Sequence, residues 1–313
     1  MEKRVHVVTT KTVPRARAAG IFLSYKAREH ILAYLLLAPS LLYLTLLIAV
    51  PFFYAIYLSL SDATVSSPGH FVGVATFQQV MADSTFWLSL RNTLIFTFGS
   101  LLGQSLIGTP LGFLLAQDVP GRKIIRAIVV LPWTIPVALS TIAFKWIFDT
   151  EFSVLNWALR TWRITSNPPI WLADPVWAMV AAIVNNVWIG FPFAAVVLLA
   201  GLTSIPVEIL EAARVDGAGF LRRFHSIIVP MIAPILFVGA LFTIVFNMTN
   251  LSVIFILTNG GPENYTQILP TWAFNVGILG GSLSSGAAIA LFLLPPLFVI
   301  VVLMLRTLGA REW

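Results

Sequence analysis

The sequence contains no cysteine, and only 10% of its 313 residues are charged. Without thiols the chain cannot form a disulfide, bind a metal through thiolate or use a cysteine nucleophile. Its four histidines are scattered, and none has a histidine four residues away, the spacing that chelates a metal on one helix face. We therefore expect neither an intrinsic metal centre nor a disulfide-stabilised secreted domain.

Apolar residues are abundant instead: they make up 58% of the chain, and the mean hydropathy is +0.91. Soluble domains usually carry about a quarter charged residues. Charge is absent from six long windows, 30–61, 92–117, 127–144, 175–207, 224–262 and 264–305. A helix of about 20 apolar residues crosses a bilayer core of about 30 Å, and only within helices can such a chain satisfy its backbone in lipid.

The sequence thus predicts an all-α polytopic membrane protein with six transmembrane helices. The predicted spans are 31–58, 93–116, 127–148, 177–199, 232–257 and 284–305. We expect 264–281 to be a loop with Trp272 and Phe274 at the membrane interface, because it contains Pro270, Asn275 and a glycine pair.

Basic residues divide unequally between the two sides of these spans, fifteen with the termini and four opposite. The positive-inside rule therefore predicts that both termini are cytoplasmic. Residues 1–30 are expected to be an uncleaved basic cytoplasmic tail, since the apolar run that follows is too long for a signal peptide. Residues 31–313 would form the membrane domain. The net charge of +6 would face anionic lipid, so it implies no nucleic-acid partner.

The predicted cytoplasmic loop 201–231 carries a short helix, at about 206–216. Ser204 could cap it, Glu208 would lie in its first turn and Gly217 would end it. Two alanines give it a thin face, and charged side chains surround that face. Such a helix could enter another protein's groove, although periodicity alone also fits an ordinary amphipathic surface helix.

Two segments of this loop resemble a family signature. Glu211-Ala212-Ala213, followed by Gly217 and then Ile227-Ile228-Val229-Pro230, is similar to the E-A-A…G…I-x-L-P signature of binding-protein-dependent ABC importer permeases. Val229 departs from it, because leucine is commoner there. The resemblance implies the type I importer permease fold and a coupling helix that docks on a separate ATPase. It assigns ATPase coupling to Glu208, Glu211, Ala212, Ala213, Asp216 and Gly217.

Similarity to the carbohydrate branch of that family, and to its first transmembrane subunit (the maltose F-type), covers about residues 30–310. It rests on the segments 131–136, 146–148, 156, 188–193 and 257–262. The extra N-terminal spans and large periplasmic insertion of some F-type proteins are not matched.

The implied partners are a second homologous permease, two copies of a cytoplasmic ATPase and an extracytoplasmic solute-binding protein. ATP and magnesium would bind to the ATPase, so this chain would need no cofactor and would not itself be an enzyme. The implied location is the cytoplasmic (inner) membrane of a prokaryote.

A solute pathway through lipid needs polar groups, and Thr243, Asn247 and Asn250 have the i, i+4, i+7 spacing of one helix face. Uncharged amides and hydroxyls suit a neutral polyhydroxy solute, although such residues also join helices in membranes. By resemblance, the sugar site maps onto Trp133, Gly190, Phe193, Thr243, Asn247 and Asn250. Phe193 and Val137 replace hydroxyl-bearing residues of the maltose protein, and Asn185 and Asn186 are weaker candidates.

Two other functions are alternatives to sugar import. A stand-alone ion-coupled secondary transporter should carry an acid or a cation site within the membrane, and the charge-free windows hold no acid. A membrane enzyme should cluster acids with histidine, but the acids at 208, 211 and 216 have no histidine beside them. The chain also lacks a phosphate-binding G-x-x-x-x-G-K-[ST] loop, so the energy would come from a partner. The sequence does not identify the sugar.

Overall fold

A computed structural model of the chain describes residues 25–309, so most of the predicted N-terminal tail lies outside the described residues. The described part forms helices and no strand, apart from two isolated bridges between 61 and 71 and between 64 and 67. It falls into two compact units, which meet between Phe53 and Tyr54. Each unit is described by itself.

The first unit contains α1 (Tyr25–Leu44), a π-helical turn (Thr45–Ala49) and the beginning of α2 (Val50–Ser59). These elements run on without a break, and Glu29–Ser59 is a 31-residue apolar helix long enough to cross a membrane. The first predicted span is therefore confirmed.

The second unit contains four more helical segments that are long and apolar enough to span a membrane. They are α4 (Ser84–Ala116), α8 (Pro175–Thr203), Phe220–Leu257 and Leu283–Arg306. The third of these comprises α10 (Phe220–Arg223), a π-helical turn (Phe224–Ile228), α11 (Val229–Met248) and α12 (Ser252–Leu257). The fourth comprises α14 (Leu283–Leu291) and most of α15 (Leu294–Gly309). Shorter helices are α3 (Ala75–Ala82) and α7 (Val154–Thr161).

The remaining predicted span, 127–148, is not one straight helix. It consists of α5 (Arg122–Thr134) and α6 (Val137–Ile147), whose axes differ by 91°. Proline has no N–H to donate and disfavours helical geometry in the residue before it. Accordingly, Ile135 is extended (φ −78°, ψ 131°) just before Pro136. The chain thus has five candidate spans among the described residues, or six if this bent pair counts as one.

The predicted span 232–257 is also interrupted, because residues 249–251 separate α11 from α12. The side chain of Asn250 accepts a hydrogen bond from the backbone N–H of Val253 at 3.2 Å, which satisfies a free donor in the first turn of α12. Asn250 therefore lies in the break, not on the helix face that the sequence pattern predicted.

The prediction of a loop over 264–281 is wrong for its second half. Residues 269–279 form α13 (Leu269–Phe274) and a π-helical turn (Asn275–Leu279). Trp272, expected at the interface, is only 8% exposed and packs with Phe86, Met248 and Leu269 in an apolar cluster. Phe274 is half-buried with its ring edge against Phe255. Burial of these side chains stabilises a helix despite the proline and glycines.

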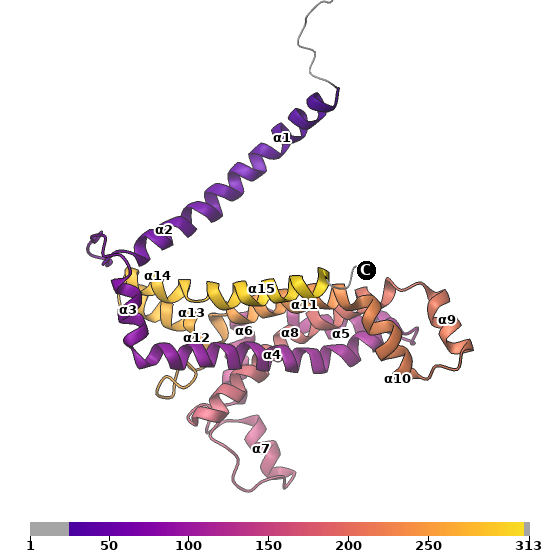
Figure 1. Ribbon diagram of the computed structural model, residues 1–313. Helices are drawn as coiled ribbons and strands as arrows, with labels where there is room; N and C mark the ends of the chain where they lie inside the picture. Colours follow the sequence, from indigo (N-terminus) through magenta and orange to yellow (C-terminus); the bar gives the residue numbers. More distant parts are fainter. Residues whose placement is uncertain (1–24, 310–313) are drawn as a thin grey trace, which may run out of the picture. The chain divides into compact units, whose positions relative to one another are not determined.

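Helices α4 and α8 pack closely through small residues. A Cβ atom added to Gly108 would lie 2.6 Å from Ala194 Cβ and 2.9 Å from the carbonyl oxygen of Phe191. The two helices form the centre of the second unit, and in Figure 1 α9 (Val207–Val215) and α10 lie at one end of it, with α3 and α14 at the other. Glycine at 108 allows this close approach of the two backbones.

Replacing Gly108 with valine should separate α4 from α8. Because backbone atoms of α8 block the new side chain, the expected destabilisation is roughly 1–3 kcal/mol, as for overpacked cores. The measurement is the midpoint of thermal unfolding of the purified protein in detergent. Gly219→Ala is the matched control, since nothing lies within 4 Å of its Cβ position and its φ of −63° suits alanine. Equal midpoints for the two variants would contradict this account of the packing.

Candidate functional site

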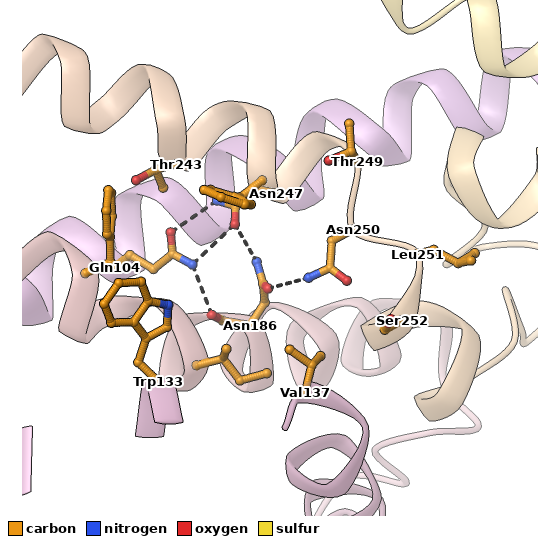
Figure 2. A pocket seen from close by; sticks show the side chains of 14 residues that line it. Gln104, Trp133, Val137, Asn186, Thr243, Asn247, Thr249, Asn250, Leu251 and Ser252 are labelled. Atoms are coloured by element: carbon orange, nitrogen blue, oxygen red, sulfur yellow. Dashed lines mark hydrogen bonds between the residues drawn. The ribbon is translucent and has the colours of Figure 1, made fainter. Parts of the chain in front are cut away.

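A cavity of about 460 Å³ lies where α4, α5, α8 and the α11–α12 break come together (Figure 2). It is lined by one polar and one apolar group of side chains, and no lining residue is ionisable. The lining residues are Gln104, Trp133, Val137, Asn186, Ile189, Gly190, Phe193, Thr243, Phe246, Asn247, Thr249, Asn250, Leu251 and Ser252.

The polar part of the wall is a chain of four carboxamides from three segments of the fold. Asn247 Oδ1 accepts from Asn186 Nδ2 at 2.9 Å and from Gln104 Nε2 at 3.3 Å, and Asn250 Nδ2 donates to Asn186 Oδ1 at 3.0 Å. Figure 2 shows these bonds as one connected network. Uncharged amides present both donors and acceptors without any fixed charge.

The apolar part of the wall is built around two aromatic rings. Trp133, near the end of α5, and Phe193, on α8, have ring centroids 5.7 Å apart and planes inclined at 57°. Trp133 is 52% exposed, so other side chains do not fully cover its ring. The bend at Pro136 ends α5 just after Trp133, which leaves the indole beside the cavity. An aromatic face beside amides is suited to a ligand with both C–H and O–H surfaces.

All six residues predicted for a solute site line this one cavity. They do not line it equally. Asn247 is 4% exposed, and all its hydrogen-bonding positions are used within the protein, whereas the Thr243 hydroxyl donates to its own helix at Gly239 O, 2.9 Å away. Gly190 contributes main chain and space only.

Two members of the carboxamide network were missed or ranked low from the sequence. Asn186 was considered a packing residue, yet it lines the cavity four residues before Gly190 and seven before Phe193, a spacing that could have placed it on their face. Gln104 was not predicted at all. Asn185 is fully buried, with its Oδ1 3.5 Å from Ser140 Oγ, and does not line the cavity.

The predicted coupling residues lie together on and directly after α9. Glu208, Glu211 and Asp216 are exposed, as is Ala212, while Ala213 is turned inward at 7% exposure. The two alanines therefore do not share one outer face. Ser204 does not cap α9 as expected, because its hydroxyl donates to Gly201 O at 2.7 Å and it ends α8 instead. Pro206 occupies the residue before α9.

Helix α9 ends in a C-terminal cap that is centred on a glycine. Gly217 has φ +74°, its N–H donates to Arg214 O at 3.0 Å, and the N–H of Ala218 donates to Ala213 O at 3.0 Å. This pair of bonds is the Schellman motif, which satisfies carbonyls that a helix end leaves free. Nothing lies within 4 Å of a Cβ at Gly217, so its backbone conformation, not a lack of space, requires glycine.

Comparison with known proteins identifies the family. Residues 108–311 match the family described as "Binding-protein-dependent transport system inner membrane component". The trehalose/maltose transport system permease protein of Thermococcus litoralis is 32% identical over 89% of this chain and 94% of its own length. The diacetylchitobiose uptake system permease protein of Streptomyces coelicolor is 29% identical over 95% of this chain and 91% of its own.

Among solved structures, a bacterial ABC transporter involved in the import of the acidic polysaccharide alginate contains a chain with the same fold. The TM-score is 0.75 at 22% identity, covering 92% of this chain and 97% of that one. The family predicted from the E-A-A loop is confirmed, and so is the inner-membrane location that the resemblance implied. This chain belongs to the family of inner-membrane permease components of binding-protein-dependent ABC transport systems.

Proposed function

We propose that this chain is one transmembrane subunit of an ATP-driven importer that moves a sugar or sugar-like solute across the cytoplasmic membrane by alternating access. The observation that carries the proposal is the cavity, in which uncharged carboxamides face two aromatic rings at the break between α11 and α12. Broken helices within the membrane are acceptable where they line a cavity. The named relatives that transport trehalose, maltose or diacetylchitobiose support the same solute class.

The residues of the solute site in this proposal are Trp133, Gly190, Phe193, Thr243, Asn247 and Asn250, with Asn186 added from the structure. A sugar ring would stack on Trp133 and Phe193 and exchange hydrogen bonds with the amides. An uncharged wall favours a neutral sugar over an acidic one, because a buried anion without a cationic partner is costly.

The loop around α9 would face the cytoplasm and dock on a separate ATPase. Glu208, Glu211, Ala212, Ala213, Asp216 and Gly217 would form this contact. Apolar side chains support the assignment, since Val207 is 58% and Val215 is 88% exposed on a face predicted to meet water. Exposed apolar groups beside charges are typical of protein interfaces. The assembly would contain a second permease, two ATPase copies that bind ATP and magnesium, and an extracytoplasmic solute-binding protein, with both termini of this chain in the cytoplasm.

Purification of the tagged chain from its native membranes provides the test. We expect an ATP-hydrolysing subunit and a second permease to co-purify. Reconstituted in proteoliposomes with the solute-binding protein, the assembly should take up radiolabelled maltose, trehalose or diacetylchitobiose only when ATP is supplied on the ATPase side. Uptake driven by an ion gradient without nucleotide, or purification of the chain without any ATPase, would contradict the proposal.

A further inference from the structure

Gln104 is a buried glutamine in the middle of α4, and its side chain joins residues that are distant in the sequence. It is only 3% exposed. Its Nε2 donates to the backbone carbonyl of Asn186 at 3.0 Å and to Asn247 Oδ1 at 3.3 Å, and its Oε1 accepts from Asn247 Nδ2 at 3.1 Å. A single side chain thus holds one main-chain group and the amide of Asn247.

Backbone groups at the two ends of the network fix which way every amide points. At one end the carbonyl oxygens of Asn186 and Thr97 can only accept, so Gln104 Nε2 and Asn247 Nδ2 must face them, at 3.0 and 3.4 Å. At the other end the N–H of Val253 can only donate, so Asn250 Oδ1 must face it. Between these ends each amide nitrogen meets an amide oxygen.

This arrangement leaves defined hydrogen-bonding groups for a ligand. Asn247 uses both its N–H groups and both its oxygen lone pairs on Gln104, Asn186 and Thr97. Within the described part of the chain, Asn186 and Asn250 each retain one N–H and one lone pair. The solute would therefore meet a fixed donor and acceptor pattern on these two residues.

We propose that Gln104 is a positioning residue of the solute site: acting through Asn247, it helps to set the donor and acceptor pattern that Asn186 and Asn250 present to the sugar. This inference rests on the proposed function of the cavity. Gln104 orients Asn247 from one end of the network, the N–H of Val253 orients Asn250 from the other, and Asn186 is held between Asn247 and Asn250. Without Gln104, Asn247 keeps only its 3.4 Å bond to Thr97 O and its bond to Asn186, so its amide can turn and release Asn186 from one of its two partners. The hydroxyls of a sugar then lose their matched partners.

The amide of Gln104 occupies space that is free because residue 190 is a glycine. A Cβ atom on Gly190 would lie 2.1 Å from Gln104 Nε2 and 2.6 Å from Gln104 Cδ. Those atoms carry the hydrogen bonds to Asn186 and Asn247. Gly190 therefore contributes to the site by admitting Gln104, and the two residues should behave as one unit in a double-mutant test.

Gln104→Met tests the proposal, because methionine keeps an unbranched side chain but lacks the amide. In proteoliposomes containing the whole importer, we expect the KM for the sugar that the wild type takes up, maltose, trehalose or diacetylchitobiose, to rise about tenfold, as for the loss of specific hydrogen bonds in a binding site. The maximal uptake rate should change less than about threefold, because the fold and the ATPase contact are retained. Ser100→Ala is the matched control: Ser100 is buried one turn earlier on α4 and its hydroxyl has no partner in the described structure, so its KM should match the wild type.

A double-mutant cycle separates positioning from general packing. Gln104→Ala and Gly190→Ala should each raise the KM about tenfold, and the double variant should show about the same KM as either single variant. Multiplied effects in the double variant, or an unchanged KM in Gln104→Met, would overturn the proposal while the proposed function stands. If the chain purifies without an ATPase, or if uptake runs on an ion gradient without nucleotide, the proposed function fails and this inference fails with it.

Discussion

Gly217→Val is expected to abolish most sugar uptake while the chain still inserts and the assembly still hydrolyses ATP. A β-branched residue at φ +74° loses roughly 1–2 kcal/mol relative to glycine in the left-handed conformation. That penalty lowers the population of the observed helix end, relative to other conformations of the loop, by a factor of about 5–30. Because the hydrogen bonds from 217 and 218 to Arg214 and Ala213 close α9, losing them would disturb the proposed contact with the ATPase.

Gly217→Asn provides the control for this prediction. Asparagine tolerates the left-handed conformation far better than valine, and nothing within 4 Å of the Cβ position would collide with either side chain. ATP-driven uptake and ATP hydrolysis are measured on the same proteoliposomes. We expect the asparagine variant to keep most of its coupled uptake. Equal uptake by the valine variant and the wild type would remove Gly217 from the coupling site.

The sequence was sufficient to predict the spans because charge cannot remain in lipid without cost. Five of the six predicted spans contain a helix long and apolar enough to cross a membrane, and the sixth, 127–148, is the bent pair of α5 and α6. The bend occurs at Pro136, whose ring restrains Ile135. The size of that bend, 91°, could not be predicted. It depends on how α6 packs against α12 and α8, which is a property of the whole fold.

The wrong prediction of a loop over 269–279 also arises from contacts between distant parts of the chain. Proline, asparagine and glycine suggested a loop, and those residues do disfavour helices in isolation. In the structure Thr93, on α4, accepts a hydrogen bond from the N–H of Leu269 at 2.9 Å, across 176 residues of sequence. Buried Trp272 adds apolar contacts. Tertiary contacts outweighed local propensity, and no local pattern contains them.

Only some of the cavity residues could be predicted from the sequence. The spacing of Thr243, Asn247 and Asn250 indicated a shared direction, although Asn250 reaches the cavity from a helix break. Gln104 was invisible because its bonds to Asn186 and Asn247 span 82 and 143 residues. A glutamine in an apolar window carries no local sign of such partners.

Asn247→Ala is expected to be the most damaging single change in the cavity. The substitution removes all four hydrogen bonds of this amide and takes away the partners of Gln104 Oε1 and Asn186 Nδ2. Asn186 is then no longer held in the orientation that matches the sugar, and because a mismatched buried polar group costs about 1–3 kcal/mol, we expect the KM for sugar uptake to rise by more than about tenfold. Basal ATP hydrolysis should persist, because Asn247 lies about 27 Å along α11 from Val229, the end of the helix that follows α9 and α10.

Thr243→Val tests whether the effect of Asn247→Ala comes from the amide network or is common to any residue that lines the cavity. Both residues line the cavity on α11, and sequence spacing ranked them equally. The hydroxyl of Thr243, however, donates only to Gly239 on its own helix, so the near-isosteric valine should raise the KM less than about threefold, within the usual net value of one hydrogen bond. Uptake kinetics of the two variants in matched proteoliposomes decide the point. Similar KM values would mean that the hydroxyl of Thr243 contributes as much to sugar binding as the Asn247 network does, which would contradict the prediction. A small effect at Asn247 would mean that its four bonds serve helix packing alone.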